Sequence, residues 1–182
     1  QEVLKHHPNL VAYLFEPAKE NVEVLYENVL DRKINILPSA LSNFSGDSTL
    51  FSDFPGSGTA SLTKREIPSS SASFDLVTQV EVTTLEEFWK NNICSNYIDF
   101  IKIDVEGHEL DVLKGCGKKI KDINVIQFEF GGTHVDTRVF FRDFWNFFEE
   151  NNFCLYRISG KKCICINAYS LDLEVFQTTN LS

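Results

Sequence analysis

Residues 99–115 read D-F-I-K-I-D-V-E-G-H-E-L-D-V-L-K-G, and this stretch decides the fold. Residues 100–103 form a short apolar run, which is typical of a strand that is buried on both faces. Leu110, Leu113 and the helix breaker Gly115 then form a short helix pattern. Between them, around Gly107, lie the polar side chains Asp104, Glu106, His108 and Glu109. A buried strand that ends in acids and turns into a helix puts those acids where open α/β sheets bind ligands.

The sequence before this stretch alternates between strand and helix patterns. Residues 9–15 and 34–37 are apolar and predict two buried strands, and Val22, Leu25 and Val29 predict an amphipathic helix over 18–30. Strand, helix, strand is the pattern of a parallel sheet with crossover helices, so we expect an α/β fold. Residues 2–5 resemble the end of a further helix. With 182 residues and no visible boundary, the chain predicts one domain over residues 1–182.

The remaining elements follow in order along the chain. Residues 48–51 and 77–82 predict strands, and residues 52–74 between them are rich in Ser, Gly and Pro and predict a long loop. Thr83 or Thr84 is expected to cap a short helix. Residues 124–130 predict another strand, a phenylalanine-rich helix follows from Asp136 or Thr137 to Asn151, and residues 153–169 predict an antiparallel hairpin that turns at 159–161.

Composition excludes several classes of protein. The net charge of -9 argues against a nucleic-acid partner, because proteins that bind the nucleic-acid backbone are basic. No apolar run approaches the ~20 residues of a membrane span, and no signal-peptide pattern opens the chain, so we expect a cytoplasmic protein. The five cysteines include no C-x-x-C pair and are expected to be buried, reduced thiols. The absence of methionine indicates a chain that is processed or belongs to something longer.

The ends of the strands carry the candidate chemistry. Asp104 with Glu106, His108 and Glu109 could deprotonate a hydroxyl group or hold a divalent ion; alternatively, they form a capped turn with solvated acids. Glu16 could bind the two hydroxyls of a ribose, or it could satisfy free N–H groups at a helix N-terminus. Glu129 and His134, after the next strand, could face the same crevice. The chain has no glycine-rich phosphate loop and no G-x-S-x-G elbow.

Several segments together resemble one family. The stretch I-K-I-D-V-E-G-H-E over 101–109, followed by V-L-K-G over 112–115, resembles the signature of FkbM-type methyltransferases. Similar segments occur in the same order along nearly all of the chain, at 15–17, 40–42, 58–62, 82–88 and 126–130. The resemblance implies a Rossmann-like class I methyltransferase fold, with a mostly parallel sheet, helices on both faces and a C-terminal antiparallel hairpin.

The resemblance also implies an activity and a set of site residues. These enzymes use S-adenosyl-L-methionine, typically to methylate hydroxyl groups, and the expected acceptor is a sugar, another small molecule or a glycan. Glu16 and Pro17 would bind the ribose of the cofactor, and Ser39, Ala40 and Leu41 would line its adenine. Asp104 or His108 would be the base that takes the hydroxyl proton, with Glu106 orienting it; no metal is expected.

One part of the family pattern is absent from this sequence. The family's first strand and its D-x-G-A-N-x-G-like loop would lie upstream of Glu2, with that strand central in the sheet. We therefore expect these 182 residues alone to bind the cofactor weakly or not at all, because unpaired buried backbone groups cost ~1–3 kcal/mol each. Two other functions stay open: an inactive binding module with this fold, and a metal-dependent enzyme using Asp104, Glu106, His108 and Glu129.

Overall fold

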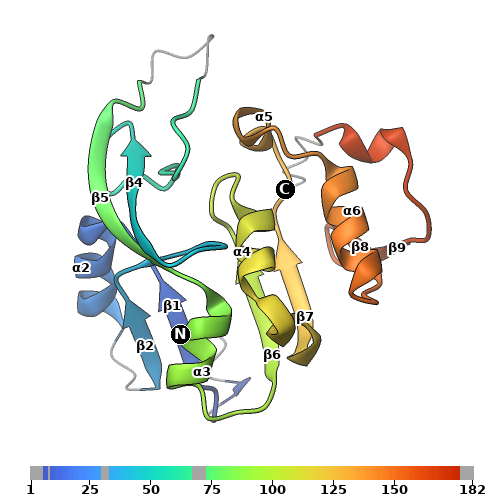
Figure 1. Ribbon diagram of the computed structural model, residues 1–182, viewed down its shortest axis with the longest axis horizontal. Coiled ribbons are helices and arrows are strands. Elements are labelled where there is room, and N and C mark those ends of the chain that lie inside the picture. The colour runs from blue at the N-terminus through green and yellow to red at the C-terminus, as the bar shows by residue number, and fades with distance from the viewer. Residues whose placement is uncertain (1–5, 8, 30–32, 67–72, 177–182) are drawn as a thin grey trace.

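The computed structural model describes residues 6–7, 9–29, 33–66 and 73–176 (Figure 1). The expected helix end at residues 2–5 and the serines at 69–71 lie outside these residues. Within them the chain is an α/β protein with two parallel strand pairs and a C-terminal antiparallel hairpin, as the sequence predicts.

The first parallel pair is built from the strand–helix–strand unit near the start of the chain. Strand β1 (Ala12–Phe15) pairs with β2 (Ile34–Leu37), and helix α2 (Lys19–Asn28) connects them. Pro17 precedes the helix, and Val22 is its fully buried apolar residue. The carboxyl ends of both strands therefore lie side by side, where the sequence places Glu16 and Ser39.

A twisted three-stranded sheet follows. Strand β3 (Ala40–Leu41) pairs in parallel with β5 (Leu76–Thr83), which pairs antiparallel with β4 (Gly46–Ser52). The expected long loop joins β4 to β5. Residues 57–66 of this loop are called here the covering segment. They contact the turn at 104–108, which follows the strand at Ile98–Ile103.

The second parallel pair contains part of the stretch at residues 99–115. Strand β6 (Ile98–Ile103) pairs with β7 (Ile123–Phe128), and helix α4 (Glu109–Gly115) and the short helix η1 (Gly117–Asp122) connect them. Helix α4 lies over this pair, and β1, β2 and β7 point toward the same side of the molecule (Figure 1). Among the described residues β1 is hydrogen-bonded to β2 and β6 to β7, with no strand bonded between the two pairs.

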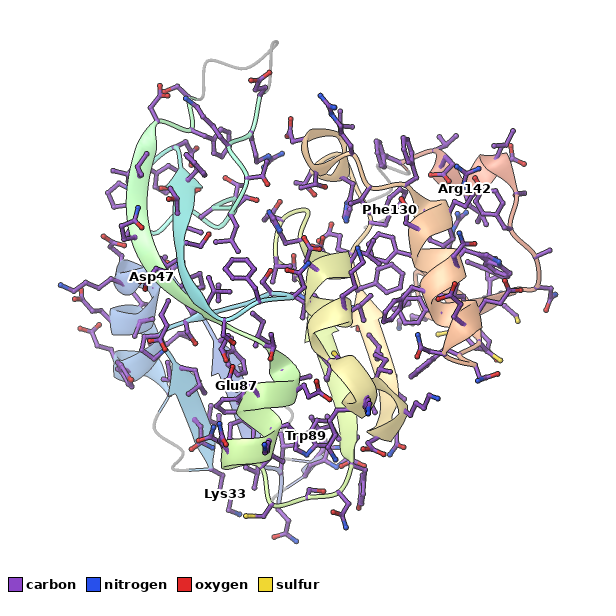
Figure 2. The ribbon with its side chains drawn as sticks, viewed as in Figure 1. Lys33, Asp47, Glu87, Trp89, Phe130 and Arg142 are labelled. Carbon is purple, nitrogen blue, oxygen red and sulfur yellow. The ribbon has the colours of Figure 1, made fainter. Side chains whose placement is uncertain are left out.

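Helix α3 (Leu85–Asn92) packs against both parallel strand pairs, which are the two halves of the structure. Thr84 caps it as expected, because its Oγ1 accepts a hydrogen bond of 3.1 Å from the backbone N–H of Glu87. On one side Phe88 packs edge-on against Phe15 of β1, with ring centroids 4.8 Å apart. On the other side Trp89 is buried in the core formed with α4, η1 and β6 (Figure 2). The helix thus belongs to both halves.

The phenylalanine-rich region is two helices, and the expectation of one continuous helix from 136 or 137 to 151 is wrong. Helix α5 (His134–Thr137) ends at Arg138, which adopts a left-handed conformation with φ 57°. Helix α6 (Phe141–Glu150) begins after an extended Phe140. The side chain of Glu174 accepts hydrogen bonds from the first two backbone N–H groups of α6, at Phe141 (2.7 Å) and Arg142 (3.0 Å).

The apolar face of α6 is narrower than its sequence suggests. Phe144 and Phe148 are buried and stack on Phe128 of β7, with centroids 4.7 and 5.2 Å apart, whereas Phe140 is exposed. Figure 2 shows Phe130 among the ring side chains between β7 and this helix. The core of this half is therefore a cluster of aromatic rings.

The C-terminal hairpin is formed by β8 (Leu155–Ser159) and β9 (Lys162–Ile166), followed by the short helix η2 (Leu171–Glu174). All five cysteines are free thiols, but the expectation that they are buried is correct only for Cys116. The other four are exposed: Cys163 and Cys165 lie on β9, Cys154 precedes β8, and Cys94 follows α3. None of the described helices could cross a membrane.

Candidate active site

The ends of β6 and β7 bring two carboxyl groups together. Asp104 follows β6 and Glu129 follows β7, and because Ile103 pairs with Phe128 the two acids lie at neighbouring positions. The Nζ of Lys102 donates a bond of 2.6 Å to Oδ2 of Asp104. The carboxylate of Asp104 is still 39% exposed, so a substrate can reach it.

The surroundings of Asp104 and Glu129 shift their pKa values in opposite directions. The ammonium of Lys102 lowers the pKa of Asp104. Partial burial and the neighbouring Asp104 raise the pKa of Glu129. Asp104 therefore ionises more readily than Glu129, and Glu129 is the one of the two that is protonated more easily.

Glu106 does not orient Asp104 or His108 through any contact in the described structure. Its carboxylate lies 3.7 Å from NH1 of Arg65 in the covering segment. Burial raises its pKa, and the charge of Arg65 opposes that shift. Glu106 also has a positive φ of 54°, which is uncommon for a residue with a side chain and is often found at functional sites.

His108 is held on both sides of its ring. Its Nε2 lies 2.8 Å from Oγ1 of Thr63, and its Nδ1 lies 3.2 Å from Oδ2 of Asp111. The side chain is mostly buried. With both nitrogens engaged, this imidazole is less available to a substrate than the carboxylate of Asp104.

The covering segment is fixed to the turn at 104–108 at several points. Besides Thr63 and Arg65, Ser61 donates a hydrogen bond of 2.8 Å from its hydroxyl to the carbonyl of Glu106. Arg65 lies between Glu106 and Asp136, 3.9 Å from the latter, and its Nε has no hydrogen-bond partner among the described residues. The long loop thus forms one wall of the site.

The residues expected to bind the cofactor lie at the ends of the first strand pair. One carboxylate oxygen of Glu16, Oε1, accepts a bond of 2.8 Å from the backbone N–H of Ala18, as a helix N-terminal carboxylate does. Pro17 is partly exposed beside it. Ser39 and Ala40 are buried, and Leu41 is partly buried next to β5.

The described residues do not offer a set of ligands for the metal-dependent alternative. Among the residues that the structure describes, no group of three or more His, Cys, Asp or Glu side chains is arranged to hold a metal ion. Asp104, Glu106 and His108 have separate partners, and Glu129 contacts Asp104 alone of these three.

Sequence reasoning missed some members of the site. Lys102 could have been found, because residues two apart in a strand lie on the same face and Lys102 precedes Asp104 by two. Arg65 and Thr63 lie in a loop without a readable pattern. The contact of Glu109 with His134 joins two turns that are 25 positions apart, and no local signal predicts it.

Parallel strands joined by crossover helices, with acids at the carboxyl ends, form an α/β fold that is consistent with a methyltransferase. The family model of the FkbM methyltransferase domain matches residues 5–157, and the chain belongs to this family. It is a methyltransferase by that membership. No curated protein and no solved structure matches the chain.

Proposed function

We propose that this methyltransferase takes a methyl group from S-adenosyl-L-methionine and transfers it to a hydroxyl group of a sugar or another small molecule. The observation that carries the proposal is Asp104, an exposed carboxylate at the end of β6 that Lys102 holds in place. Methyl transfer is an in-line displacement, so the protein has to align the two reactants and accept the hydroxyl proton.

The cofactor would be held at the ends of the first strand pair. Glu16 uses one oxygen on Ala18, and its Oε2 has no hydrogen-bond partner among the described residues, so it suits a ribose hydroxyl. Pro17 would lie against the ribose, with Ser39, Ala40 and Leu41 beside the adenine. When bound, S-adenosyl-L-methionine supplies an electrophilic methyl group on a sulfonium.

Asp104 suits the role of base better than His108. Its carboxylate is reachable and ionised, whereas both ring nitrogens of His108 are engaged within the protein. Glu129 lies beside Asp104 and its pKa is raised, so a proton that Asp104 takes from the acceptor has a second carboxylate close by. Lys102 keeps the carboxylate of Asp104 pointing in one direction.

The test is transfer of a labelled methyl group from S-adenosyl-L-methionine to a panel of sugars and small polyols. We expect Asp104→Asn to lower the rate with any acceptor found by about 100-fold or more, because a positioned base contributes that much. Asp99→Asn is the matched control, since Asp99 lies exposed at the other end of β6 and should leave the rate unchanged.

Two outcomes would contradict the proposal. Equal rates for Asp104→Asn and the unmodified chain would remove Asp104 from the chemistry. No transfer to any hydroxylated acceptor by a protein that binds S-adenosyl-L-methionine in calorimetry would instead favour a binding module with this fold.

A further inference from the structure

The carboxylate of Glu109 organises the turn that carries Asp104 and Glu106. Glu109 lies in the first turn of α4, and its side chain is only 1% exposed. Its Oε1 accepts a hydrogen bond of 3.0 Å from the backbone N–H of Val105, and its Oε2 accepts one of 3.0 Å from Gly107. One buried side chain thus fixes the path of the backbone from β6 into α4.

His134 fixes the corresponding turn after β7. Its side chain is 0% exposed, and its Nδ1 lies 3.2 Å from both the backbone N and the carbonyl O of Gly131. The rings of Phe130 and Phe144 pack against it, with centroids 5.0 and 5.4 Å away. If Nδ1 accepts from the N–H of Gly131, the ring proton lies on Nε2.

The two turns meet at this pair of side chains. Nε2 of His134 lies 2.9 Å from Oε2 of Glu109, although the approach is too bent for a well-formed hydrogen bond. The backbones meet as well: a Cβ on Gly107, where φ is +102°, would lie 3.0 Å from the carbonyl oxygen of Thr133. This close contact and the positive φ account for a glycine at 107.

Asp104 and Glu129 are carried by these same two turns, at the ends of β6 and β7. We propose that Glu109 and His134 are positioning residues, whose buried contact holds the two turns at the spacing that brings Asp104 against Glu129. Neither side chain is exposed, so neither can touch a substrate, and their effect has to act through the carboxyl pair. The link to methyl transfer rests on the proposed function, but the spacing itself does not.

The test reads the carboxyl pair directly. ¹³C NMR follows the titration of the side-chain carbons of Asp104 and Glu129 and needs neither cofactor nor acceptor. The charged groups that act on the pair, Lys102, Glu106 and Glu109, are retained in every variant except the one at 109. In the unmodified protein we expect two separate titration midpoints, with Asp104 the lower.

Three variants distinguish the outcomes. His134→Phe keeps an aromatic ring in the pocket but removes Nε2, and Glu109→Gln leaves one acceptor oxygen for two N–H groups; both should bring the midpoints of Asp104 and Glu129 closer together. His134→Gln retains an amide nitrogen that can face Glu109 and should preserve most of the separation. Asp111→Asn, on the same helix but bonded to His108, is the control and should leave the midpoints unchanged.

Unchanged midpoints in folded His134→Phe would overturn the proposal. If that variant does not fold, the isosteric Glu109→Gln decides the question on the midpoint of Asp104 alone, because the charge of Glu109 itself raises the pKa of Glu129. Once an acceptor is known, the same variants should lower kcat by up to about 100-fold with little change in KM, as misplacement of a reacting group does. Loss of activity in Asp104→Asn concerns the proposed function; the NMR result concerns only the positioning pair.

Discussion

At the scale of single residues, the character of Asp104 is set by its neighbours. Lys102 lies two positions earlier on the same face of β6 and bonds to its carboxylate, and Glu129 reaches it from β7. The first neighbour favours the ionised form of Asp104, and the second is an acid whose own pKa is raised. An aspartate with only solvent around it would have neither a fixed direction nor a shifted pKa.

Replacing Lys102 should therefore change the pH dependence of methyl transfer. Lys102 lowers the pKa of Asp104, so Lys102→Met should raise that pKa toward or above its ordinary value. A smaller fraction of Asp104 is then ionised at acidic pH, and the acidic limb of kcat/KM against pH should move to higher pH. The control is Lys161→Met on the hairpin turn; an unmoved acidic limb in Lys102→Met would show that Asp104 is not the titrating base.

At the scale of elements, the break between α5 and α6 shows what the sequence could not reveal. The phenylalanine spacing over 136–151 fits one helix, and nothing local marks Arg138 as left-handed. The start of α6 is fixed by Glu174, which lies 33 positions from Phe141 and reaches its free N–H groups. Aspartate or glutamate at this end also interacts favourably with the helix dipole.

Glu174→Gln should weaken α6 from its N-terminus. Gln has one acceptor oxygen in place of two and no charge, and loss of a helix cap typically costs ~1 kcal/mol. We expect the free energy of unfolding in urea to fall by about that amount. Asp172→Asn, an exposed position of the same η2 turn, should leave it unchanged, and equal stability of the Glu174→Gln variant would mean that these bonds do not hold the helix.

The strands and the first helices were predictable because their signals are local. The apolar runs at 34–37 and 100–103 lie within β2 and β6, and the Thr84 cap is confirmed. The expectation that the second run is buried on both faces is wrong, because Phe100 is 53% exposed among the described residues. Exposed cysteines on the hairpin were not predictable, because an apolar alternation does not say which face will be covered. The candidate site divides in the same way: Asp104 is visible at a strand end, whereas the contacts of Arg65 with Glu106 and of His134 with Glu109 join distant segments.

At the scale of the whole molecule, the two strand pairs are connected by few elements. Helix α3 packs on both pairs. A further connection is a close backbone contact between the end of α4 and the residue that follows β3. The last residue of α4, Gly115, lies against the chain just after β3: a Cβ built on Gly115 would be 2.0 Å from the carbonyl oxygen of Ser42. Asn43 adds a hydrogen bond of 2.9 Å to Asp111 of α4.

Gly115→Ala should therefore destabilise the protein although it improves the helix. Helix propensity alone favours alanine over glycine by up to ~1 kcal/mol. The added methyl group would meet the backbone oxygen of Ser42, which cannot turn away as a flexible side chain can, and overpacking of this kind costs ~1–3 kcal/mol. We expect a lower urea midpoint for Gly115→Ala, and no such loss for Gly58→Ala, where the new methyl group meets nothing within 4 Å. A Gly115→Ala variant as stable as the unmodified chain would mean that α4 and the end of β3 do not pack this closely.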